Sequence, residues 1–74
     1  RVLNVMEKIE IVKKILNLVT CATARQISVL AKVRLNEDIS AGSVSGVLRT
    51  LEQKGKACSS RNERGANVYW LIEE

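Results

Sequence analysis

Small hydrogen-bonding side chains surround a single arginine in the stretch between Ser43 and Gln53. None of these residues is acidic. The set is Ser43, Ser45, Gly46, Arg49, Thr50 and Gln53. An arginine can donate two hydrogen bonds to guanine, and hydroxyl and amide groups suit other base edges in a DNA major groove. The residue types therefore favour contact with double-stranded DNA.

Gly46 is an unusual choice for the exposed side of a helix, where glycine costs about 1 kcal/mol relative to alanine. Close approach of another backbone is the usual compensation for such a cost. A small residue in a tolerant position would also explain it. The sequence leaves both explanations open.

The spacing of apolar residues indicates that a helix of about residues 40–54 positions this polar set. Val44, Val47, Leu48 and Leu51 recur at i, i+3, i+4 and i+7, which places them on one buried stripe. Ser40 is a good N-cap, and Ile39 with Val44 can form a hydrophobic staple. Gly55 suits the left-handed position after the last turn, next to Lys54.

The remaining chain predicts two earlier helices and a later hairpin. Periodicity indicates a helix from about Asn4 to Leu18, and a capping box of Thr23 and Gln26 indicates a second start. Strands are predicted at 56–61 and 67–72, joined by a loop at 62–66 in which Gly65 supplies the positive φ. A predicted core set lies on the helices: Val12, Leu16, Ile27, Leu30, Val44, Leu48 and Leu51.

The positive charge is concentrated in the second half of the chain. The net charge is +4, and five cations between residues 49 and 64 outnumber two glutamates there. Outside the central arginine these cations are Lys54, Lys56, Arg61 and Arg64. A basic surface of this kind favours a polyanionic partner, although +4 is also ordinary for a soluble domain.

Composition argues against several other function classes. Histidine is absent, so no Ser–His or Cys–His pair can form, and 74 residues leave little room for a deep pocket. We therefore expect no enzyme activity, no small-molecule ligand and no cofactor. Cys21 and Cys58 match no metal-binding spacing, so we expect no metal site and two free thiols.

Length and hydropathy predict one domain spanning residues 1–74. Because the chain opens on Arg1, we expect it either to be excised from a longer protein or to carry added residues at its start. No long apolar run indicates a membrane span or a signal peptide. We expect a cytoplasmic protein associated with the nucleoid, or a nuclear protein if the source is a eukaryote.

The order of these elements resembles an α+β winged helix-turn-helix with three helices and a C-terminal β-hairpin wing. The run from Ile39 to Gly55 is similar to the recognition helix of bacterial winged-helix regulators of the MarR type. The ending Arg64-Gly65-x-x-x-Tyr69-Trp70-Leu71 resembles the last strand of small fimbrial-operon regulators of the PapI type. The link at 32–38 is longer than the family pattern and leaves the angle between the second and third helices open.

The resemblance implies a transcriptional regulator whose third helix enters the major groove. It implies base or phosphate contacts from that helix, with Arg49 on guanine and Lys54 and Lys56 on phosphates. It places Arg61 and Arg64 on a wing of about residues 61–66, against the DNA backbone or minor groove. The alternative is a winged helix that binds proteins, and an exposed Trp70 would favour it. A homodimer or a second protein partner also stays open.

Overall fold

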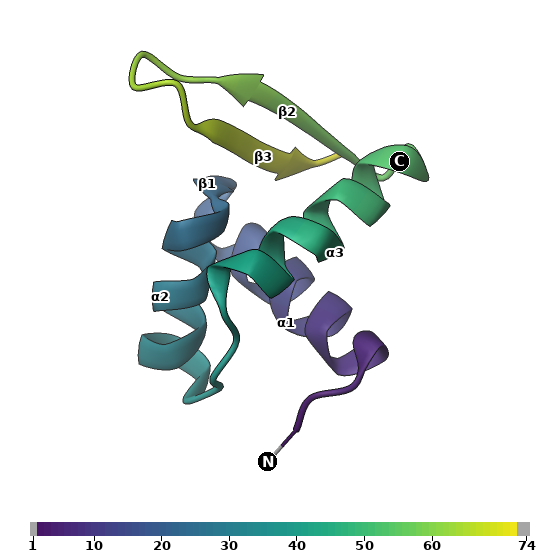
Figure 1. Cartoon of the computed structure of the whole chain (residues 1–74), viewed down its shortest axis with the longest axis vertical. Coiled ribbons are helices and arrows are strands. Elements are labelled where there is room, and N and C mark those ends of the chain that lie inside the picture. Colours follow the sequence, from purple (N-terminus) through teal and green to yellow (C-terminus); the bar gives the residue numbers. More distant parts are fainter. Residues whose placement is uncertain (1, 73–74) are drawn as a thin grey trace.

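The computed structural model describes residues 2–72 as three helices and one three-stranded sheet (Figure 1). The elements follow the order α1 (Val5–Val19), β1 (Cys21–Thr23), α2 (Ala24–Leu35), α3 (Ala41–Gln53), β2 (Ala57–Arg61) and β3 (Asn67–Leu71). These bounds agree with the sequence prediction to within about one residue at most ends. The predicted α+β fold with three helices and a C-terminal hairpin is confirmed. In residues 2–72 no helix combines the length and apolar character that crossing a membrane requires.

Side-chain caps begin α1, α2 and α3, and those at Thr23 and Ser40 are the ones that the sequence predicts. The Asn4 and Thr23 side chains accept the backbone N–H groups of Glu7 and Gln26, and both helices have reciprocal capping boxes. The Ser40 hydroxyl accepts the Ser43 N–H at the start of α3. Each cap satisfies a first-turn donor that has no partner inside the helix, which locates the helix starts.

The core lies between the three helices and the inner face of the sheet. Ile15, Ile27, Leu48, Val12 and Val44 are its largest fully buried side chains. Six of the seven predicted core residues are buried, and the exception is Leu30, which is only partly buried. Leu30 lies at the margin, where it lines a surface groove beside α2.

The apolar stripe of α1 extends beyond the region that its neighbours cover. Val5 and Leu18, which the periodicity assigns to the stripe, are 68% and 64% exposed. Both lie within the end turns, at the margins of the contacts with α3 and α2, where they line surface grooves. Periodicity gives the direction of a side chain around a helix, and the packing of other elements decides how much of that direction is covered.

The sheet is antiparallel, with strand order β1-β3-β2. Tyr69 pairs with Ala22 and Ser59, while Trp70 pairs with Cys21 and Cys58. Because successive side chains alternate between faces, Tyr69 is buried against the helices and Trp70 is only partly buried on the outer face. The Tyr69 ring therefore belongs to the core beneath the sheet.

The two cysteines are free, as predicted. Both are opposite Trp70, one on each side of the central strand β3. Two strand spacings of about 4.8 Å separate their backbones, which exceeds the Cα separation of about 7 Å that a disulfide tolerates. The strand order therefore prevents an intramolecular bridge.

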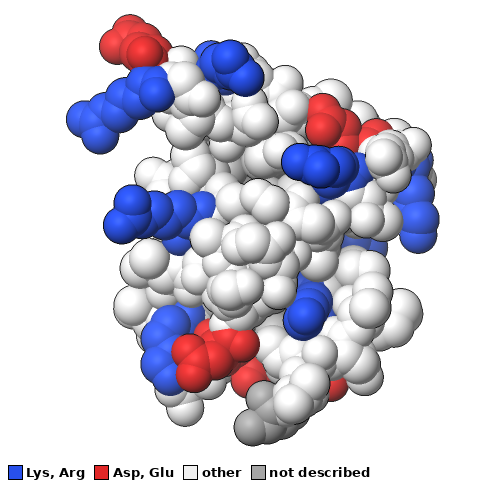
Figure 2. Space-filling view, in the orientation of Figure 1, with Lys and Arg blue, Asp and Glu red and all other residues white. Residues whose placement is uncertain are grey.

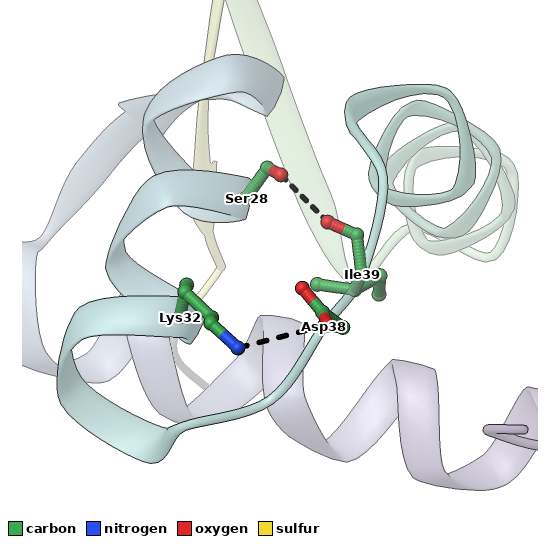
Figure 3. Close-up of polar contacts among 4 residues, drawn as sticks. All are labelled: Ser28, Lys32, Asp38 and Ile39. Atoms are coloured by element: carbon green, nitrogen blue, oxygen red, sulfur yellow. Dashed lines mark hydrogen bonds and ion pairs between the residues drawn. The ribbon is translucent and has the colours of Figure 1, made fainter. Parts of the chain in front are cut away.

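The connection between α2 and α3 is shorter than expected, because α2 continues to Leu35 and the link predicted at 32–38 begins only at Asn36. Two side-chain contacts join this connection to α2. Asn36 ends α2 in a left-handed conformation with φ 54°. The Ser28 hydroxyl then donates to the Ile39 carbonyl at 2.6 Å, and Lys32 lies 3.6 Å from the Asp38 carboxylate (Figure 3). Ile39 is 7% exposed and packs into the core just before α3. The connection is thus attached to α2 along its second half, and this attachment sets where α3 begins.

Candidate nucleic-acid interface

The outer face of α3 is uncharged apart from one arginine. At about 100° per residue, Gly42, Gly46, Arg49 and Gln53 lie opposite the buried stripe of Val44, Leu48 and Leu51. All four are exposed, whereas Ser45 is half-buried toward the hairpin. The structure therefore brings Gly46, Arg49 and Gln53 together as predicted. Gly42 belongs to the same face, one turn before Gly46. The sequence analysis did not include it.

Ser43 and Thr50 lie on the side of α3 that faces α1. They line a groove with Val5, Lys8 and Ile9 of α1. The Thr50 hydroxyl donates to the Gly46 carbonyl at 3.0 Å, so its proton is already engaged within the helix. Ser43 accepts from the Ser40 hydroxyl at 3.1 Å, which leaves the Ser43 proton for another acceptor. Of these two predicted contact residues, Ser43 is the one with a donor to offer.

Gly46 has no packing reason to be glycine in the free protein. A Cβ atom built at this position meets nothing within 4 Å, and the helix here is regular. No contact within the described residues therefore requires glycine here. If a close backbone approach explains Gly46, that backbone belongs to another molecule. The space next to Gly46 is open to solvent.

The hairpin loop is shaped by one asparagine. The Asn62 side-chain oxygen accepts the backbone N–H groups of Arg64 and Ala66 at 2.9 and 3.0 Å. The Asn62 N–H donates to the Ala66 carbonyl at 2.8 Å, and Gly65 turns with φ 80°. Asn62 thus defines the backbone on which Arg64 is exposed. Sequence reasoning assigned residues 62–66 to a loop but gave Asn62 no role.

A groove of about 520 Å3 separates the hairpin loop from the first turns of α2 and α3. Arg25 and Gln26 of α2, Ser45 of α3 and Arg64 of the loop line it. Two arginines from distant parts of the sequence therefore border one concave surface. Arg25 is a cation that sequence reasoning missed. Its position just after the Thr23 cap, in the first turn of a helix, was the available signal.

The predicted phosphate-contacting lysines lie at the other end of α3. Lys54 is the C-cap residue and Lys56 immediately precedes β2, and both are exposed. One acid, Glu52, lies between this end and the sheet, where its carboxylate accepts the Ser59 hydroxyl at 2.8 Å. Arg61 is exposed at the end of β2. The predicted cations thus form two groups, one at each end of the α3 face.

The surface charges surround this face. Figure 2 shows Lys and Arg side chains on the hairpin, beside α2, and on both sides of α3, around an uncharged area over the first turns of α3. Acidic side chains on this face lie mainly at its periphery. Small neutral groups at the centre and cations around them can hydrogen-bond to a polyanion without local repulsion.

Comparison with known proteins adds no functional assignment. No family model matches the chain, and no curated protein matches it.

Proposed function

We propose that this domain binds double-stranded DNA sequence-specifically as part of a transcriptional regulator, with α3 in the major groove. The observation that carries the proposal is the exposed face of α3, in which Gly42, Gly46 and Arg49 lie between cationic borders. A major groove about 12 Å wide admits one helix whose outer side chains are short. Arg49 then contacts guanine, and Gln53 and Ser45 contact neighbouring bases or phosphates.

The hairpin supplies contacts that do not depend on sequence. Arg61 and Arg64 lie at the end of β2 and on the loop, and both are exposed. Lys54 and Lys56 serve the same role at the far end of α3. Cations in these positions bind phosphates and fix the orientation of α3 without discriminating between bases.

A protein-binding module is the second candidate, and apolar residues away from α3 favour it. Val29 and Val33 are 55% and 72% exposed one turn apart on α2. Val19 and Val29 border a groove of about 530 Å3 beside β1. Centres of protein interfaces are apolar, whereas the outer face of α3 is polar. Catalysis has no comparable support, and we propose no enzyme activity.

Salt-titrated binding to a random-sequence duplex separates these candidates. For the DNA-binding function we expect binding at low salt, with the logarithm of the association constant falling linearly with the logarithm of the salt concentration. Absence of binding at low salt would contradict DNA binding and favour the protein-binding module.

Selection of sites from random DNA tests the roles of two arginines. We expect Arg49→Ala to lose about 1–3 kcal/mol on the selected site and to relax preference at one base pair. Arg64→Ala should weaken all sequences alike and flatten the salt slope by about one unit. An Arg49→Ala variant that keeps the parent preference, with an Arg64→Ala variant that changes it, would reverse the assignment.

A further inference from the structure

Lys8 is a cation on α1 that forms no ion pair with another side chain in the described residues 2–72. It lies in the first half of α1 and is half-buried. Its side chain lines the groove of about 320 Å3 between α1 and α3, with Ser43, Gly46 and Thr50 on the opposite wall. Half-burial places the stem of Lys8 along the groove wall, and an anion in this groove would lie within reach of its ammonium group.

The α1 groove and the hairpin groove lie on opposite sides of α3. Ser43 borders the first and Ser45 the second, and two residues of helix separate their directions by about 160°. Figure 1 shows the same arrangement, with the hairpin on one side of α3 and the first half of α1 on the other. The cations facing α3 are therefore Arg25 and Arg64 on one side and Lys8 on the other.

A major groove is bounded by two phosphate backbones, one from each strand. A helix lying in it has one backbone on either side, about 12 Å apart. The two cationic borders of α3 correspond to that arrangement. We propose that Lys8 and the Ser43 hydroxyl bind a phosphate of the DNA strand opposite to the one contacted by Arg25 and Arg64. This inference rests on the proposed function.

The same geometry explains why residue 46 is glycine. Gly46 forms part of the wall that faces Lys8, and a Cβ there would project into open space. Without a side chain the backbone of α3 can approach the phosphate, and Lys8 can reach it from the other wall. The Ser43 proton, which no group in residues 2–72 accepts, points to the same ligand chemistry.

Binding to random duplex DNA with three variants tests the charge. We expect Lys8→Gln to weaken binding to all sequences and to reduce the salt slope by about 0.9, the value for one phosphate contact. Gln removes the charge and keeps the Cβ and Cγ methylenes of the stem, and melting curves check that the fold is retained. Lys8→Arg should retain the parent slope. Lys14→Gln is the matched control, because Lys14 is an exposed lysine of the same helix outside the groove.

Ethylation interference on both strands of a site selected from random DNA tests the location of the phosphate that Lys8 contacts. The parent should show sensitive phosphates on both strands, on either side of one stretch of major groove. Lys8→Gln should lose sensitivity on one strand, and Arg64→Ala on the other. Loss at the same phosphates in both variants, or equal behaviour of Lys8→Gln and Lys14→Gln, would overturn the Lys8 site alone. A parent protein without salt-dependent binding would overturn the proposed function and the Lys8 site with it.

Discussion

Single residues carry the strongest local signals in this domain, and Gly46 is the clearest. It occurs in a regular helix where neither backbone geometry nor internal packing requires glycine. A glycine that lowers helix stability and improves no contact within the fold is expected where another molecule must come close to the helix backbone.

Substitution of Gly46 should separate stability from binding. We expect Gly46→Ala to stabilise the free domain by about 0.4–1 kcal/mol, because alanine restricts the unfolded chain and its Cβ meets open space. Gly46→Leu should fold but bind DNA more weakly, since its side chain extends into the gap beside Ser43 and Lys8. Thermal melts and DNA titrations measure both effects. Parent-like DNA binding by Gly46→Leu would mean that another surface meets DNA.

Arg25 and Lys8 show what residue-level sequence analysis lacks. Helix periodicity gives the direction of each side chain within its own helix, and it located the polar face of α3. It does not say which residues of α1 and α2 border that face, because that depends on how the helices cross. Arg25 and Lys8 come within reach of α3 only through tertiary packing.

At the scale of elements, the hairpin loop is a small, internally bonded unit. Two backbone N–H groups bind one carboxamide oxygen, so the loop keeps its shape without help from the core. A preformed loop loses less conformational freedom when it binds.

Asn62→Ala should free this loop. We expect faster amide hydrogen exchange at Arg64 and Ala66, a small change in melting temperature, and weaker binding to random DNA. The effect should largely disappear in an Arg64→Ala background, because Asn62 acts by placing Arg64. Asn67→Ala is the control, since Asn67 borders the same groove without bonding to the loop. An equal loss of affinity from Asn67→Ala would point to direct amide contacts with DNA instead.

The elements themselves were largely predictable from local sequence. Caps at Thr23 and Ser40 and the positive φ at Gly55 and Gly65 depend on neighbouring residues, and each occurs as expected. The connection after α2 was less predictable. The hydrogen bond from Ser28 to Ile39 joins residues eleven positions apart. No local rule indicates such a bond.

At the scale of the molecule, one small core supports every surface described above. Leu48 and Val44 of α3 are fully buried together with residues of α1 and α2. The position of the exposed face of α3 therefore depends on the same contacts that stabilise the fold.

Leu48→Ala should cost about 2–5 kcal/mol, a large part of the stability of a domain of this size. Chemical denaturation with circular dichroism measures the loss. Val33→Ala serves as the comparison, because Val33 is 72% exposed and its truncation leaves no cavity. A Leu48→Ala variant as stable as Val33→Ala would show that α3 is not packed as described.

The central position of β3 also determines when the sheet can form during synthesis. β1 and β2 are edge strands, and β3 is hydrogen-bonded to both. On a ribosome, β1 therefore waits for a partner that emerges roughly 45 residues later, a delay of roughly 2–9 s at common elongation rates. All three helices have emerged before β3 begins, because α3 ends at Gln53, and their sheet-facing side stays uncovered until β3 follows. A nascent chain stalled before residue 67 would thus present apolar surface to chaperones, and release of the last strand would remove it.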